Sequence, residues 1–162
     1  MNAVTQAPRS RVTRPGGNLA SQLIGVWALV RYADEQRGRE DAYPFGPEPE
    51  GFLIYTAEGI VSAQLMKPGR PAFQSEDWDH GTPQEYEASG SGYIAYCGRY
   101  EVDEAKGTVT HIPSVSLLPN LIHGRQSRLI DLEGDRLVLR AAGAGPGGGL
   151  PTTRRLEWKR IA

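Results

Sequence analysis

The segment GYIAYCGRYEVD, residues 92–103, restricts the fold more than any other part of the chain. Side-chain character changes there at every second position, and a period of two is typical of a β-strand. Odd positions carry Arg99 and Glu101, whereas even positions carry Ile94 and Val102. Burying unpaired charges costs several kcal/mol each, so the even face is predicted to be the inner one.

Strand-like segments recur at short, regular intervals along the chain, with 20 glycines and 12 prolines to supply turns. They do not alternate with helical patterns, which argues against a parallel sheet. The pattern predicts an all-β fold, namely an antiparallel up-and-down barrel of about eight strands, because a closed barrel leaves no edge exposed. The predicted strands are 23–35, 51–56, 60–66, 92–103, 107–117, a hairpin over 125–140, and 152–161.

One segment, 67–91, interrupts this rhythm and is predicted to form a flap over one end of the barrel. It contains a helix-start pattern, with Thr82 as N-cap, Pro83 in the first helical position and Glu85 three residues after the cap. A short helix is therefore expected at about 80–90. Trp78 lies in the same segment and is a candidate to cap a cavity mouth.

Charge and composition exclude several classes of partner. The 18 basic and 19 acidic side chains leave no positive excess to neutralise phosphates, so no nucleic acid is expected. No apolar run approaches the ~18 residues of a membrane span, so no membrane partner is expected. Cys97 is the only cysteine, which excludes an intrachain disulfide and a cysteine-based metal cluster.

The N-terminal residues 1–20 are polar and lack the apolar core of a secretory signal. They are predicted to be a disordered tail, followed by one barrel domain over 21–162, in a cytoplasmic protein. A homodimer is left open by the sequence.

The inner face of 92–103 brings Tyr96 and Tyr100 into the barrel, and buried phenols need hydrogen-bond partners. The next strand offers His111 on the same face as Val109, Val115 and Leu117. A four-residue loop at 104–107 would place Tyr100 directly opposite His111. The expected interior is a mostly apolar cavity with a few polar groups, the composition of a small-molecule site.

Two roles remain open for His111: a general acid or base, or a core histidine that only satisfies buried polarity. In the first role Tyr100 would orient the imidazole or donate a hydrogen bond to a developing oxyanion. Further candidate ligand-binding residues are Tyr96, Tyr55, Gln64, Met66, Gln126, Arg128 and Trp78.

Other chemistry is less well supported. His80 beside Asp77 and Asp79 is more typical of a solvated loop than of a metal site, and no metal is predicted. Cys97 falls on the outer face without an adjacent base. Motifs of nucleophilic hydrolases and of dinucleotide-binding loops are not found, so no cofactor is expected.

Several motifs resemble, in order, those of the bacterial and fungal lipocalin-like domain family. The resemblance extends over about 23–160 and includes GVW at 25–27, YPFGPEPEGFLIYTAEGIVSAQLM at 43–66, GYIAYCGRYEVD at 92–103, TVTHIPSVSLLPN at 108–120 and GDRLVL at 134–139. It implies a ligand-binding barrel in which Trp27 plugs the floor beneath an arginine from the last strand, Arg154 or Arg155. It also implies kinship with cofactor-independent cyclases of natural-product biosynthesis.

The sequence thus leaves three functions open. The preferred one is a cofactor-independent cyclase or isomerase that holds a small, largely apolar intermediate in a reactive conformation. The alternative is a non-catalytic carrier of such a molecule. The third is a barrel with a filled core that binds a partner through its outer surface.

Overall fold

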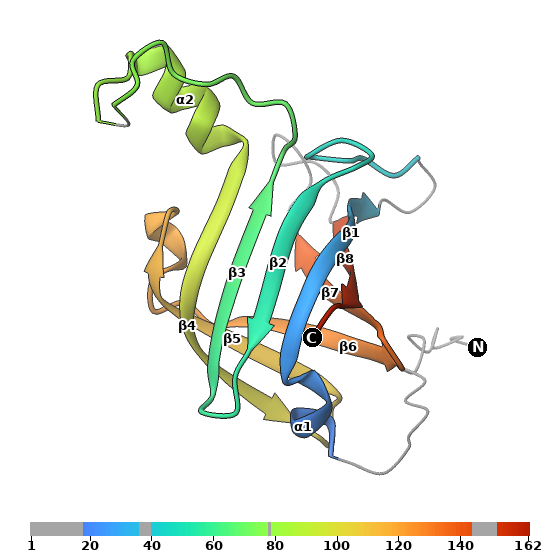
Figure 1. Cartoon of the computed structure of the whole chain (residues 1–162). Coiled ribbons are helices and arrows are strands. Elements are labelled where there is room, and N and C mark those ends of the chain that lie inside the picture. The colour runs from blue at the N-terminus through green and yellow to red at the C-terminus, as the bar shows by residue number, and fades with distance from the viewer. Residues whose placement is uncertain (1–17, 36–39, 78, 144–151) are drawn as a thin grey trace, which may run out of the picture.

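The computed structural model describes residues 18–35, 40–77, 79–143 and 152–162, and these form a closed antiparallel barrel (Figure 1). Each strand pairs with the next along the chain, and the last pairs with the first, so the predicted up-and-down barrel of eight strands is confirmed. The strands are β1 (Gly25–Glu35), β2 (Glu50–Tyr55), β3 (Ile60–Met66), β4 (Tyr93–Asp103), β5 (Thr108–Ser116), β6 (Gln126–Glu133), β7 (Arg136–Gly143) and β8 (Thr152–Arg160).

Alternation along the strands places apolar side chains inside. In β3, Val61, Ala63 and Leu65 are buried, whereas the residues between them are only half-buried. The same rule holds at the centre of β4, where Tyr96 is buried and Arg99 is exposed. The even face of the 92–103 segment is therefore the inner one, as predicted.

One end of the barrel is closed by a short helix that the sequence patterns did not reveal. This helix, α1 (Leu19–Leu23), lies beneath the barrel in Figure 1 and buries Leu19 and Leu23. Asn18 caps it, and Glu104 accepts hydrogen bonds from the backbone N–H groups of Leu19 and Ala20 at 2.9 and 3.0 Å. The tail predicted over 1–20 was therefore wrong at its last residues, while 1–17 lie outside the described part of the chain.

Trp27 fills the floor above α1, as the family resemblance implied. It is fully buried, and its indole N–H donates to the carbonyl oxygen of Leu23 at 2.9 Å. The guanidinium of Arg160 lies 4.0 Å from the ring centroid and donates to the carbonyl oxygens of Ile24 and Gln22.

The expectation that Arg154 or Arg155 covers Trp27 was wrong. The register of β1 with β8 places Arg160 opposite Trp27, and the other two arginines lie farther along the strand beside Asp34 and Glu35. A count of residues within one strand does not reveal this cross-strand register.

The predicted helix within 67–91 is confirmed as α2 (Pro83–Ser91), at the barrel end opposite α1 (Figure 1). Its capping box is complete: the Thr82 side chain accepts from the Glu85 backbone N–H, and the Glu85 carboxylate accepts from the Thr82 backbone N–H at 2.7 Å. None of its residues is buried. Trp78 lies outside the described residues.

We predict that Arg160→Met lowers the free energy of unfolding by about 2 kcal/mol, because it removes a cation–π contact and two hydrogen bonds that cap α1. Urea denaturation monitored by circular dichroism measures the change. Lys159→Met, at an exposed position of the same strand, is the control and should shift stability by less than about 0.5 kcal/mol. Equal stability of the two variants would contradict the assigned role of Arg160.

Candidate functional site

The site begins with an irregularity in the pairing of β4 and β5. Tyr100 pairs with His111 as predicted, but the register shifts between Cys97 and Gly98. A Cβ on Gly98 would come within 2.1 Å of the Ile112 carbonyl oxygen, so the strands can approach this closely only at glycine.

Beyond this bulge the alternation of β5 changes phase. Val115 and Leu117, expected on the inner face with His111, are 68% and 46% exposed. A bulge adds one residue to one strand and moves the side chains after it to the other face. The inner-face expectation was therefore correct for Val109 and His111 and wrong for Val115 and Leu117.

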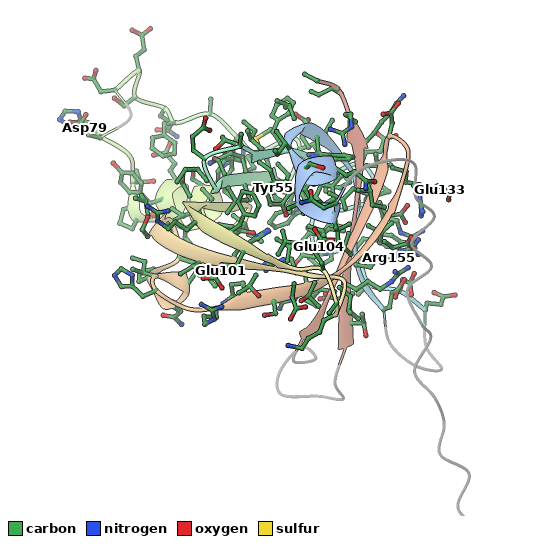
Figure 2. All side chains as sticks on the ribbon, turned by 90° about the horizontal axis from the view of Figure 1, so that it is seen from below. Tyr55, Asp79, Glu101, Glu104, Glu133 and Arg155 are labelled. Atoms are coloured by element: carbon green, nitrogen blue, oxygen red, sulfur yellow. The ribbon has the colours of Figure 1, made fainter. Side chains whose placement is uncertain are left out.

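His111 lies at the centre of a buried hydrogen-bonded chain drawn from three strands. Its Nε2 is 2.6 Å from the Tyr55 hydroxyl of β2, and its Nδ1 is 2.8 Å from the Tyr96 hydroxyl of β4. The relative exposures are 0% for His111, 1% for Tyr55 and 7% for Tyr96. Figure 2, seen from the α1 end, shows Tyr55 among the side chains that fill the barrel.

Burial decides the protonation states in this chain. Loss of solvation, reinforced by the positive charge of Arg128, holds the pKa of His111 well below its usual 6.5. Burial likewise raises the pKa of Tyr55 and of Tyr96 above 10.0. Near neutral pH the chain therefore consists of a neutral imidazole between two protonated phenols.

Tyr100 does not join this chain, although it faces His111 across the strands. Its hydroxyl donates to the backbone oxygen of Thr56 at 2.9 Å, and its ring packs edge-on against Tyr55 with centroids 4.8 Å apart. The Tyr100–His111 hydrogen bond expected from the sequence is thus absent. Strand register places Cα atoms opposite each other, but the Tyr100 side chain turns toward the β2–β3 turn.

Above the chain lies a cavity of about 120 Å³ that continues toward the barrel end opposite α1. Most of its wall is apolar, with polar groups from several strands among them. The lining residues are Tyr32, Leu53, Leu65, Ile94, Tyr96, His111, Leu118, Leu121, Gln126, Arg128, Leu139, Arg154, Leu156 and Trp158.

The structure brings together four of the predicted site residues at this cavity, namely His111, Tyr96, Gln126 and Arg128. Tyr55 does not line the cavity, and its hydroxyl is hydrogen-bonded to His111, which does.

Gln64 and Met66, predicted to line the cavity, lie on the other face of β3. The inner positions of that strand are Val61, Ala63 and Leu65. Gln64 instead accepts a hydrogen bond from the Tyr93 hydroxyl at 2.8 Å on the outer side. The odd positions of β3 are all apolar, whereas the even positions include Ser62 and Gln64, so counting alternation from these two polar residues would have given the correct face.

Sequence reasoning missed Tyr32 and Trp158 as wall residues and named Arg154 only for another role. Tyr32 and Arg154 come from the paired strands β1 and β8. A bulge between Leu29 and Arg31 shifts the alternation of β1, so parity counted from Trp27 fails for Tyr32. Leu118 and Leu121 come from the segment after β5, where the 3-10 turn η1 (Pro119–Leu121) lies.

Two arginines in the cavity wall differ in their partners. Arg154 lies 3.5 Å from a carboxylate oxygen of Asp34, a buried residue of β1. Arg128 donates to the backbone oxygen of Gln126, and it forms no ion pair within the described part of the chain. Asp77, Asp79 and His80 cluster elsewhere, on the exposed loop before α2.

Comparison with known proteins decides the family. The model of the lipocalin-like domain matches residues 24–161. The chain belongs to the lipocalin-like domain family.

Among curated proteins, this lipocalin-like domain is similar to the 4'-hydroxy-3'-methoxypropiophenone carrier protein of Aspergillus oryzae. The two are 30% identical over 107 residues, which covers 62% of this chain and 96% of the relative. Among solved structures, it matches bovine odorant binding protein in complex with a selenium-containing odorant. That match has a TM-score of 0.43 and 13% identity, and it covers 94% of this chain and 78% of the other.

Within the described residues of the lipocalin-like domain, no helix is both long and apolar enough to cross a membrane.

The buried imidazole gives the lipocalin-like domain a defined pH dependence of stability. His111 is neutral when folded, but in the unfolded chain it binds a proton below about pH 6.5. The unfolded state then holds more protons, so this contribution to stability is complete above that pH and is lost as the pH falls. Its slope reaches at most about 1.4 kcal/mol per pH unit.

We predict that wild type is more stable than His111→Gln at pH 7.5 and that this advantage shrinks between about pH 6.5 and pH 5. Urea denaturation at several pH values measures it. Comparison with the variant cancels contributions from the other titrating groups. An advantage that stays constant over this range would contradict a neutral buried His111.

Proposed function

We propose that this lipocalin-like domain binds and carries a small, largely apolar organic molecule inside its barrel. The observation that supports this most is the internal cavity, lined mainly by leucines and aromatic rings with polar groups at a few positions. This is the usual composition of a small-molecule site, since apolar area supplies affinity and a few polar groups fix orientation. A core filled by its own side chains would have favoured a surface-binding barrel instead.

The size of the cavity limits the ligand. At about 120 Å³ it is comparable to cavities of roughly 150 Å³ that accept benzene. A single aromatic ring is therefore of the right order, and a longer molecule would extend toward the mouth past Leu118 and Leu121.

The carrier protein of Aspergillus oryzae supports the same size and chemistry. The ligand in its name is an aryl ketone with one ring and a short chain. We use that compound as a probe and not as the assigned ligand of this domain.

A second candidate is the cofactor-independent cyclase or isomerase, and the Tyr96–His111 pair at the cavity wall favours it. Both ring nitrogens of His111 are held by phenols, so the imidazole has no free nitrogen for a substrate. A proton would have to pass through the Tyr96 hydroxyl. Because this arrangement satisfies the imidazole without any substrate, we place the carrier first.

We predict that Leu118→Trp weakens binding of 4'-hydroxy-3'-methoxypropiophenone about tenfold or more, because the larger side chain occupies the cavity mouth. Isothermal titration calorimetry measures the dissociation constant. Leu117→Trp is the matched control, because Leu117 is 46% exposed and Leu118 is 39% exposed. Only Leu118 lines the cavity. Equal effects of both changes, or no binding by wild type, would contradict the carrier proposal.

The two candidates differ in what happens to a bound ketone. We expect the carrier to leave the α-hydrogens of the same probe exchanging with D₂O no faster than in buffer. A proton-transferring enzyme would accelerate that exchange, and His111→Gln would abolish the acceleration. Proton NMR follows the α-methylene signal, and a His111-dependent acceleration would replace the carrier by the enzyme.

A further inference from the structure

We infer that the cavity selects ligands whose polar end is a hydrogen-bond acceptor oxygen, preferably one with negative charge, held by the Tyr96 hydroxyl and the Arg128 guanidinium. This inference rests on the proposed binding function and names the class of molecule that the cavity takes. It follows from a count of hydrogens in the buried chain and from the partners of the two arginines.

The chain of Tyr55, His111 and Tyr96 contains one more donor hydrogen than it has hydrogen bonds. A neutral imidazole carries one N–H, and each phenol carries one O–H, which makes three donors. The chain contains two hydrogen bonds, one at each ring nitrogen. The phenol that accepts the imidazole N–H therefore keeps its own hydroxyl hydrogen free for another acceptor.

The full burial of Tyr55 indicates that the free hydroxyl hydrogen belongs to Tyr96. Tyr55 is fully buried, and its hydroxyl has His111 as its one polar partner among the described residues. An unpaired donor there would cost about 1–3 kcal/mol. Tyr96 lines the cavity, where a ligand or water can accept. Tyr55 therefore donates to Nε2, Nδ1–H donates to Tyr96, and Tyr96 donates into the cavity.

Arg128 supplies a second donor and a positive charge at the same wall. Its position on β6 alternates inward with the buried Ile130, and its charge acts on both His111 and Tyr96. Asp34 lies beside Arg154, but no described carboxylate lies within ion-pair distance of Arg128. The undescribed residues 1–17, 36–39, 78 and 144–151 contain no aspartate or glutamate that could serve.

The wall as a whole is rich in donors and has no carboxylate among its described side chains. A carbonyl, phenolate or carboxylate oxygen would meet N–H and O–H groups and a positive charge. An ammonium group would meet that same charge without an acceptor of opposite sign. Charge-assisted hydrogen bonds are about twice as strong as neutral ones, so an oxyanion should bind better than a neutral oxygen.

Four probes of similar size test this, since each has one benzene ring and a different substituent: benzoate is anionic, acetophenone is a neutral ketone, ethylbenzene is apolar and benzylamine is cationic. Calorimetry or ligand-observed NMR gives the dissociation constant of each for wild type. We expect benzoate to bind most tightly, acetophenone next, ethylbenzene more weakly and benzylamine most weakly.

Variants then identify the groups responsible. Arg128→Met should weaken benzoate about tenfold and leave ethylbenzene within about twofold, since a charge-assisted bond is lost and apolar contact is kept. Arg99→Met removes the same charge from the exposed outer face of β4 and should change neither probe. Tyr96→Phe should weaken acetophenone and benzoate about fivefold, the value of one hydrogen bond.

Two failures can be told apart. If ethylbenzene binds and Leu118→Trp prevents it, but the oxygen-containing probes bind no better, the inference is overturned and the carrier function stands. If none of the four probes binds wild type, the carrier function fails together with the inference. The order of the wild-type constants tests the inference even if Arg128→Met or Tyr96→Phe does not fold.

Discussion

The upper half of this barrel is organised around an imidazole that is wholly removed from water. Each ring nitrogen of His111 needs a hydrogen-bond partner, because a buried polar atom without one lowers the stability of the fold by about 1–3 kcal/mol. The partners come from β2 and β4, while His111 itself lies on β5. A shift of any of the three strands by one residue would separate these atoms, so the chain of hydrogen bonds fixes their register together with the apolar core.

The two ends of the barrel differ in packing: the interior is filled at one end and contains a cavity at the other. At the α1 end the interior is filled by Trp27, beneath the Arg160 guanidinium, and by the leucines of the helix. At the other end large side chains leave a cavity whose wall includes Arg128 and Tyr32. A polar side chain beside that cavity can form a hydrogen bond with a ligand or with water. The packed floor has no room for either. The donors therefore collect where the packing is incomplete.

Much of this could be predicted from the sequence, and the failures have identifiable physical causes. Period-two alternation and turn residues were enough for the eight strands, and the four-residue loop after Asp103 correctly placed Tyr100 opposite His111. Alternation fails after a bulge, which is why Val115 and Leu117 were assigned to the wrong face. Contacts that depend on side-chain direction or on pairing between distant strands, such as Tyr55 with His111 and Arg160 with Trp27, are not encoded in any local pattern.

Closure of the sheet also bears on how the chain folds. Seven of the eight strand pairs join neighbours in the sequence, and the longest connection among them is the segment 67–92 between β3 and β4, which contains α2. The pairing of β1 with β8 joins Trp27 to Arg160, so its loop-closure entropy must be overcome across nearly the whole domain. Contacts of such long sequence separation form slowly, and until they do both strands present unpaired backbone edges. The pairing of β1 with β8 that completes the barrel therefore also removes the two strand edges at which aggregation could begin.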